Sequence, residues 1–407
     1  MKYVIIIPDG AADFPLDELG GKTPFEAAKT PNMDKLAIAG RQGTAATTPD
    51  GFSCGSDVCT MSLLGYDPRR YHTGRAPLEA AALGISMDES DWIFRINLVT
   101  VIEDLMQDHS AGHISSAEGK QILADFAGRL SIPAMYLYPG VSYRNIMVDR
   151  SGSELAQPRD WSELVTTPPH DVPGEPIRKY LPVGGDHAEL LHQLIAESQI
   201  MLADHEITVT RKEMGELPAT HLWPWGQGRR PNMPTFEQRF GLKGAMITAV
   251  DLLAGISRFI DWDRLDVPGQ TSYHDNDYLA TGKHTIAAID HYDIVCAHVE
   301  APDEASHAAE AKTKVASIEA IDEHVVGPVY EALQSRGEAY RVLVMPDHYT
   351  RVDNRKHDPT PVPFVIHGHH IRSVLQRPLS EANANESDLH IEYGHELMEY
   401  FLFSGLA

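Results

Sequence analysis

The sequence YVIII at residues 3–7, closed by PDG at residues 8–10, decides the fold class. An unbroken run of apolar, mostly β-branched residues predicts a strand that is buried on both faces, and Pro-Asp-Gly is typical of a turn. The same order recurs twice, in DIVCAHV at residues 293–299 and in YRVLVM at residues 340–345, each followed by acidic residues. The sequence therefore predicts three buried strands whose carboxyl ends carry carboxylates.

Helical periodicity separates these strands, at residues 57–64, 246–259 and 315–335. Apolar strands that alternate with amphipathic helices are typical of βαβ units, so the expected fold is α/β, with a mostly parallel sheet covered by helices on both faces. The polar stretch at residues 381–387 predicts a solvated loop.

The middle of the chain has a different texture, richer in Pro and Trp, with short strand-like pieces at residues 93–101 and 145–148. We interpret residues 86–234 as an inserted α+β cap or substrate domain. Residues 1–85 and 235–407 then form the two parts of a core domain.

Acidic residues outnumber basic ones, 58 to 34, which gives a formal net charge of −24 and argues against nucleic-acid or anionic-membrane partners. No apolar run approaches the roughly 20 residues of a membrane span, and the first residues do not resemble an export signal. Three cysteines are too few for a disulfide framework, so we expect a cytoplasmic protein.

Candidate chemistry gathers where the strands end. Parallel strands deliver Asp9, Asp303 and Asp347 to one edge of the sheet, where α/β proteins bind ligands. Each Asp alone could instead cap a turn. Asp303 and His307 are four residues apart on one helix and could hold one metal ion, although a solvent-facing His is the plainer reading. Further histidines follow at positions 348 and 357.

A loop of small residues, SCGSD at residues 53–57, leads into the predicted helix at residues 57–64. It would expose the Ser56 hydroxyl beside backbone N–H groups at a helix N-terminus, which is a phosphate-binding environment. The alternative is that Ser56 only caps the helix.

Together these motifs resemble the alkaline phosphatase superfamily and, within it, the archaeal-type cofactor-independent (2,3-bisphosphoglycerate-independent) phosphoglycerate mutases. They span almost the whole chain in the order of that family. The matching segments are Pro8-Asp9-Gly10, Thr30-Pro31-Asn32-Met33-Asp34, Gly55-Ser56-Asp57, Leu64-Gly65-Tyr66-Asp67-Pro68, Thr73-Gly74-Arg75, Leu78-Glu79-Ala80, Asp303-Glu304-Ala305 with His307, Asp347-His348, and His357 with Pro361-Val362-Pro363.

The resemblance implies an alkaline-phosphatase-like core that holds two divalent ions, Mn²⁺ first, with Mg²⁺, Co²⁺ or Zn²⁺ as alternatives. It implies Ser56 as the catalytic nucleophile, which becomes phosphoserine. One ion would be held by Asp9, Ser56, Asp347 and His348, and the other by Asp303, His307 and His357.

The implied activity is the glycolytic interconversion of 2-phosphoglycerate and 3-phosphoglycerate, so the expected partner is a small phosphorylated metabolite. Cationic or polar cap residues could contact its oxyanions, although surface ion pairs or packing would also account for them. These candidates are Arg75, Arg95, His109, His113 and Arg144.

One segment departs from the mutase pattern as we know it, which reads Asp-Arg-Arg-Ala-Gly-Arg. This chain has DHSAGH at residues 108–113 and, with residues 168–173 and 222–226, is closest to a bacterial branch proposed to act as homoserine kinases. Three alternatives to the mutase follow: a homoserine phosphotransferase of threonine biosynthesis, a phosphomonoester hydrolase, and a non-catalytic protein that kept the fold.

Overall fold

The computed structural model describes residues 1–405, which fall into two compact units. Unit 1 comprises Met1–His72 and the chain from Met233 onward, and unit 2 comprises Thr73–Asn232. Unit 2 thus begins at residue 73 rather than 86 and ends at 232 rather than 234. The first boundary is earlier because helix α5 (Arg75–Ala82) packs its Ala76 and Ala80 against strand residues of unit 2.

A large mixed sheet organises unit 1. From edge to edge its strands are β15 (His390–Ile391), β2 (Arg41–Ala45), β14 (Val362–Gly368), β11 (Tyr340–Val344), β1 (Lys2–Pro8), β10 (Ile294–Val299), β8 (Gly244–Ile247) and β9 (Asp263–Arg264).

The three strands expected from the apolar runs are confirmed, and they form the centre of this sheet. β1 lies between β10 and β11 and is parallel to both, with Ile5 opposite Cys296 on one side and Leu343 on the other. Only the β11–β14 and β14–β2 pairs of this sheet are antiparallel, so the expected mostly parallel sheet is confirmed.

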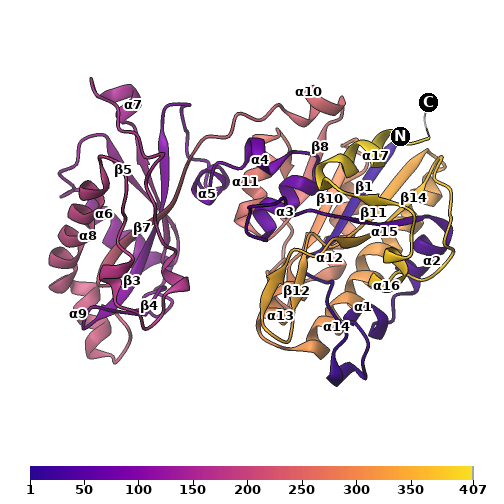
Figure 1. Cartoon of the computed structure of the whole chain (residues 1–407), viewed down its shortest axis with the longest axis horizontal. Helices are drawn as coiled ribbons and strands as arrows, with labels where there is room; N and C mark the ends of the chain where they lie inside the picture. The colour runs from indigo at the N-terminus through magenta and orange to yellow at the C-terminus, as the bar shows by residue number, and fades with distance from the viewer. Residues whose placement is uncertain (406–407) are drawn as a thin grey trace. The chain divides into compact units, whose positions relative to one another are not determined.

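Unit 1 also contains helices, several of which contact strands of its sheet (Figure 1). They are α1 (Pro24–Ala27), α2 (Pro31–Ala39), α3 (Ser56–Leu63), α4 (Pro68–Tyr71), α10 (Phe236–Phe240), α11 (Asp251–Phe259), α12 (Tyr278–Ala288), α13 (Ala301–His307), α14 (Ala311–Ile321), α15 (Gly327–Arg336), α16 (Glu381–Asn385) and α17 (Leu397–Phe403). A small hairpin, β12 (Tyr349–Arg351) with β13 (Lys356–Asp358), follows β11.

Two predictions about local structure are wrong. Residues 246–259 are not one helix, because Met246 and Ile247 end buried strand β8 and the helix begins only at Asp251. Residues 381–387 are not a solvated loop. They begin with helix α16, whose first residue Glu381 is buried and accepts hydrogen bonds from Thr23 and the Asp13 backbone.

Unit 2 is an antiparallel α+β structure. Its strands are β3 (Trp92–Ile102), β4 (Leu105–Asp108), β5 (Met135–Val141), β6 (Arg144–Asp149) and β7 (His221–Arg229), and β3 pairs with β4, β6 and β7. Helices α6 (Ser116–Ala127) and α8 (Ala188–Ala203) lie side by side on one face (Figure 1), where they pack on Phe94, Ile96 and Leu98 of β3. The remaining helices are α7 (Ser151–Glu154) and α9 (Glu206–Glu213).

Across residues 1–405, none of the helices combines the length and apolar character that crossing a membrane requires.

Candidate functional site

The three expected carboxylates do meet at one edge of the unit 1 sheet. Asp9 follows β1, Asp347 lies just beyond β11, and Asp303 stands in α13, which begins two residues after β10. Because these strands are parallel neighbours, their carboxyl ends lie together. All three side chains are buried, so the fold concentrates negative charge away from bulk water.

One cluster forms around His348. Its Nε2 atom lies 3.5 Å from Asp9 Oδ1, 3.3 Å from Asp347 Oδ2 and 3.2 Å from Ser56 Oγ. Possible ligand atoms of Asp9, Asp347 and His348 lie within 4.8 Å of one another, the spacing of donors around one ion. The four residues expected to share a metal are therefore neighbours in the fold.

A second cluster forms around Asp303. His307 Nε2 lies 3.2 Å from Asp303 Oδ2, and His357 Nε2 lies 3.4 Å from Asp303 Oδ1. The rings of His348 and His357 stack with their centroids 4.1 Å apart, which places the two clusters side by side. All seven residues that the sequence analysis grouped as ligands are thus gathered at one edge.

The outer nitrogens of the three histidines are held by oxygen atoms. His307 Nδ1 donates to the Arg355 carbonyl at 3.0 Å, and His357 Nδ1 donates to the Cys54 carbonyl at 3.1 Å. Thr350 Oγ1 already donates to Asp303, so His348 Nδ1 donates to Thr350 Oγ1 at 3.0 Å. Each ring therefore turns its Nε2 atom toward the carboxylates, where it donates a hydrogen bond when protonated and could bind a metal ion when deprotonated.

The donor set fits divalent cations. Within residues 1–405, Asp347 Oδ2 is buried without a hydrogen-bond partner, and buried polar atoms are rarely left so. The buried carboxyl groups of Asp9 and Glu300 lie close enough to share a hydrogen bond. His307 Nε2 and His357 Nε2 lie only 2.9 Å apart, so two lone pairs face each other unless a cation or proton lies between them. Carboxylate and imidazole donors together could bind a divalent metal.

Charges within the site shift the pKa values in opposite directions. Burial raises the pKa of Asp9 well above its usual value, and the charges of Asp347, Glu300 and Asp303 raise it further. Burial also opposes ionisation of Asp303, but hydrogen bonds with His307 and His357 outweigh it and lower its pKa well below the usual range. The site stores electrostatic repulsion that bound cations would relieve.

Two residues at this edge were missed by the sequence reasoning. His298 Nε2 contacts Asp9 Oδ2 at 2.7 Å and Glu300 Oε2 at 3.5 Å, and its Nδ1 contacts Thr248 Oγ1 at 3.0 Å. Asp9, His298 and Glu300 form a further group with metal-ligand spacing. Glu300 could have been found, because it directly follows a predicted strand. His298 is hidden inside the apolar run of that strand.

Ser56 is the first residue of α3, and Gly55 occupies the N-cap position. The alternative that Ser56 is the cap is therefore wrong. Its hydroxyl stands at the positive end of the helix, where backbone N–H groups favour an anion, and it is half-buried beside His348. This placement suits a nucleophile that receives a phosphoryl group.

In unit 2 the residues expected to contact the oxyanions of the substrate also lie near one another. Arg95 of β3 stacks on Trp225 at 4.2 Å and contacts Glu79 Oε2 at 3.1 Å. Burial lowers the pKa of Arg95, the Glu79 carboxylate opposes this shift, and the nearby charges of Arg75 and Arg144 lower the pKa further. Positive charge is thus concentrated around one buried guanidinium.

Aromatic contacts join the two candidate histidines to these arginines. The Tyr143 ring lies 5.7 Å from His109, 6.2 Å from His113 and 5.7 Å from the Arg144 guanidinium. His170, which was not among the predicted site residues, bridges His109 at 6.0 Å and Trp225 at 5.2 Å. The five predicted residues therefore belong to one cluster of unit 2.

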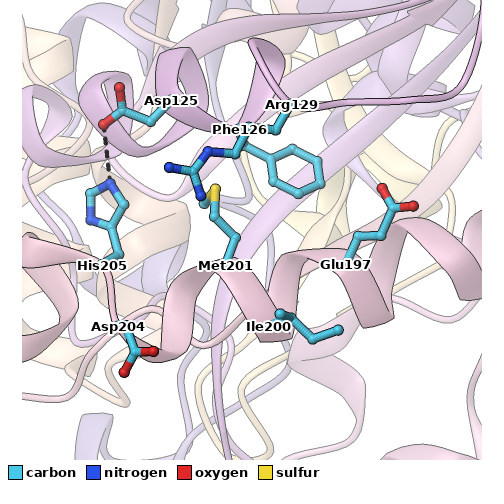
Figure 2. Close-up of a pocket in the computed structure, with 8 residues that line it drawn as sticks. All are labelled: Asp125, Phe126, Arg129, Glu197, Ile200, Met201, Asp204 and His205. Atoms are coloured by element: carbon cyan, nitrogen blue, oxygen red, sulfur yellow. Dashed lines mark hydrogen bonds and ion pairs between the residues drawn. The ribbon is translucent and has the colours of Figure 1, made fainter.

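The hollow shown in Figure 2 lies elsewhere in unit 2. It has a volume of about 580 Å³ and is lined by α6 and α8 residues, including Ile200 and Met201, and by an Asp125–His205 pair at 3.1 Å. None of the predicted site residues lines it, so it plays no part in the chemistry considered below.

Comparisons with known proteins show which family this chain is similar to. A family model described as 2,3-bisphosphoglycerate-independent phosphoglycerate mutase matches residues 37–208. A relative of that name from Methanothrix thermoacetophila is 44% identical over 402 residues, covering 99% of this chain and 100% of the relative.

Two solved structures have similar folds. A protein from Pyrococcus horikoshii is 27% identical, with a TM-score of 0.82 over 99% of this chain and 96% of that one. A cofactor-independent phosphoglycerate mutase from Thermoplasma acidophilum is 25% identical, with a TM-score of 0.67 over 99% of each chain.

Proposed function

This chain belongs to the family of 2,3-bisphosphoglycerate-independent phosphoglycerate mutases, and from that premise we propose that it interconverts 2-phosphoglycerate and 3-phosphoglycerate through a phosphoserine. The observation that carries the proposal is the full-length identity of 44% to a mutase. The gathering of seven proposed ligand residues, Ser56 among them, at one edge of the sheet supports it. The reaction would place the protein in glycolysis, in the cytoplasm.

The proposed site holds two divalent ions. Asp9, Ser56, Asp347 and His348 would bind one, and Asp303, His307 and His357 would bind the other. Oxygen and imidazole donors without thiolate suit Mn²⁺, and also Mg²⁺, Co²⁺ or Zn²⁺. When bound, such ions polarise phosphoryl oxygens and lower the pKa of a coordinated hydroxyl.

Ser56 carries the phosphoryl group in this mechanism. The Ser56 hydroxyl loses its proton as Oγ attacks the phosphorus of the substrate. The Oγ–P bond forms, the ester P–O bond breaks, and the released glycerate oxygen takes up a proton. The N-terminus of α3 stabilises the charge on the phosphoryl oxygens. In the second step the vicinal hydroxyl of the bound glycerate attacks, the Oγ–P bond breaks, and Ser56 is regenerated.

The arginine and histidine cluster of unit 2 is proposed to bind the oxyanions of the substrate. Arg75, Arg95 and Arg144 offer planar guanidinium groups that match carboxylate and phosphate. His109 and His113 offer ring N–H donors with less charge. Asp108 accepts hydrogen bonds from Ser110 and Gly112, which fixes the loop that carries both histidines.

A homoserine phosphotransferase is the second candidate. It is favoured by His109, Ser110 and His113, which stand where the mutase pattern has arginines. Fewer permanent cations suit a substrate with less negative charge, such as an amino acid. Ser56 and the metal ligands would keep the same roles.

Phosphorus NMR of the Mn²⁺-loaded protein distinguishes these activities. With 3-phosphoglycerate alone we expect the 2-phosphoglycerate signal to grow until the two reach equilibrium. Formation of O-phosphohomoserine from homoserine and a phosphoryl donor, with no isomerisation, would favour the second candidate. Release of inorganic phosphate alone would identify a hydrolase instead.

A further inference from the structure

Two cysteine thiols flank the proposed nucleophile. Cys54 lies in the loop two residues before Ser56, and Cys59 lies within the first turns of α3. Their Sγ atoms are 3.9 Å apart, so both side chains already point toward each other. Cys54 is half-buried and Cys59 is buried.

We propose that Cys54 and Cys59 are a modification site, which a hydroperoxide oxidises to a disulfide that closes a ring around Ser56 and stops turnover. The partly exposed Cys54 thiol meets the oxidant first. Formation of the disulfide does not depend on the proposed function, whereas its effect on turnover rests on the proposed role of Ser56.

The reaction proceeds in two balanced steps. The Cys54 sulfur attacks one oxygen of hydrogen peroxide, the O–O bond breaks, and Cys54 sulfenic acid and one water are formed. The Cys59 sulfur then attacks the sulfenic sulfur, the S–O bond breaks, and a disulfide and a second water are formed. The two thiols lose two electrons in total, and the peroxide gains them.

Closing the disulfide must move the nucleophile loop. The sulfur atoms have to approach from 3.9 Å to about 2.05 Å. Cys59 is held in a packed helix and contacts Thr48 Oγ1 at 3.2 Å, whereas Cys54 lies in the loop. We therefore expect most of the movement at Cys54.

That movement reaches the metal ligands through the backbone. The Cys54 carbonyl accepts the His357 Nδ1 hydrogen bond at 3.1 Å, and the Cys54 thiol donates to the Asp358 carbonyl at 3.5 Å. Shifting Cys54 disturbs both contacts and also displaces Ser56. A displacement of about 1 Å at a reacting group costs about 100-fold in rate.

Cys296 provides an internal control. It is buried in β10, and the other two cysteines of the chain lie next to Ser56 in α3 and its preceding loop. Peroxide treatment of the full-length protein, followed by alkylation and peptide mass mapping, should reduce the number of free thiols from three to one. The remaining alkylated residue should be Cys296, and the linked peptide should be lighter by two hydrogen atoms.

Activity and thiol content are measured on the same samples, before and after dithiothreitol. We expect a loss of about 100-fold that the reductant reverses. Cys54→Ser should form no disulfide and should lose no activity on peroxide treatment. In Cys59→Ala, oxidation should stop at a sulfenic acid on Cys54, which dimedone traps. Cys296→Ala should behave like the wild type.

Two results would overturn the proposal. The first is three free thiols in wild-type protein after a treatment that fully oxidises a small dithiol in the same tube. The second is a complete Cys54–Cys59 disulfide with undiminished turnover in a protein shown to form phosphoserine. Thiol mapping does not require an activity measurement. Failure of the proposed function can therefore be distinguished from failure to form the disulfide.

Discussion

At the scale of single residues, Ser56 has the clearest role to test. Replacing it with Ala removes the oxygen that would accept the phosphoryl group, so we expect turnover and phosphoenzyme formation to be abolished. The side chain is small and half-buried, so the free energy of unfolding should change by less than about 1 kcal/mol. Phosphorus NMR and urea unfolding measure the two effects.

Ser53→Ala is the matched control, because Ser53 is an exposed serine of the same loop. It should retain wild-type turnover. Appreciable turnover in Ser56→Ala, with its fold intact, would remove Ser56 from the nucleophile position.

Glu300 changes the charge balance of the site. Two divalent ions carry +4, and the three carboxylates found from the sequence leave a net +1 for an anionic substrate. Glu300 brings a fourth carboxylate within 3.5 Å of His298, and its pKa is raised well above the usual value by burial and by Asp303. Its ionised form would be drawn to the cations, which gives it a role in metal affinity.

We predict that Glu300→Gln weakens Mn²⁺ binding by about 10- to 100-fold, the effect expected when a residue supporting the ligands is altered. Isothermal titration calorimetry of the metal-free protein measures it. Glu331→Gln removes the same charge at an exposed position in α15 and should leave the Mn²⁺ affinity unchanged. Equal affinities for Glu300→Gln and wild type would exclude this role.

The residues found from the sequence share a visible pattern, because Asp9, Asp303 and Asp347 each follow an apolar run. His298 carries no such signal, since apolar residues surround it within the strand. Only the pairing of β1 with β10 places it against Asp9. The sequence predicts what a strand delivers at its end, but not which of its buried side chains faces a neighbouring strand's ligand.

At the scale of elements, buried strands were easier to predict than the elements around them. An apolar run forms a central strand whatever its partners, so β1, β10 and β11 were found nearly to the residue. Residues 381–387 looked polar and therefore solvated, yet Glu381 is buried. The buried Glu381 carboxyl group is stabilised by hydrogen bonds from Thr23 and Asp13. These residues are more than 350 positions away in the sequence, so the local sequence gives no sign of them.

A buried ion pair holds several of these elements together. Lys314 of α14 donates to Asp13 Oδ2 at 3.1 Å and to the Ala12 and Thr350 carbonyls, and it is completely buried. Asp13 also accepts from the Val352 N–H. The pair thus ties the loop after β1 to the β12 strand, and these two segments position Asp9 and Thr350.

We predict that Lys314→Met destabilises the protein by about 3–5 kcal/mol, because it leaves the Asp13 carboxylate buried without its cation. Urea unfolding followed by circular dichroism gives the value. Lys312→Met changes an exposed lysine of the same helix and should have an effect of less than about 0.5 kcal/mol. Similar stabilities of the two variants would show that the pair contributes little.

Glu381 should make stability depend on pH. Burial raises the pKa of Glu381 from 4.5 to about 7, against the hydrogen bonds that favour ionisation. Between these two pKa values the Glu381 carboxyl is protonated in the folded state but not in the unfolded state. The contribution of Glu381 to stability is therefore fully present below pH 4.5 and is lost as the pH rises through about 7. The difference corresponds to about 3 kcal/mol.

In Glu381→Gln we therefore predict that the loss of stability between pH 4.5 and pH 8 is smaller by about 3 kcal/mol than in wild type. Unfolding is measured with chelator present, so that metal binding does not vary with pH. Glu386→Gln, an exposed position of the same segment, should follow the wild-type curve. Parallel curves for Glu381→Gln and wild type would contradict the buried, protonated state.

At the scale of the whole molecule, the proposed metal site belongs to one unit, and the other unit has a hydrophobic core of its own. Unit 2 is one continuous stretch of chain and closes its own core, in which Phe94, Leu98, Phe126 and Leu194 are buried together. The proposed ligands all lie in unit 1, whose two sequence segments meet in the central sheet. Stabilisation by metal should therefore belong to unit 1 alone.

We predict that residues 73–232, expressed alone, fold cooperatively and have a Tm that Mn²⁺ does not change. In the full-length protein, a bound ion at one hundred times its Kd adds about 2.7 kcal/mol, which raises the Tm by about 5–10 °C. Asp303→Asn removes a proposed ligand and should reduce the shift. A Tm shift in the isolated unit, or none in the full-length protein, would contradict a metal site confined to unit 1. Because this stabilisation is measured without substrate, it tests the site independently of which phosphoryl acceptor the enzyme uses.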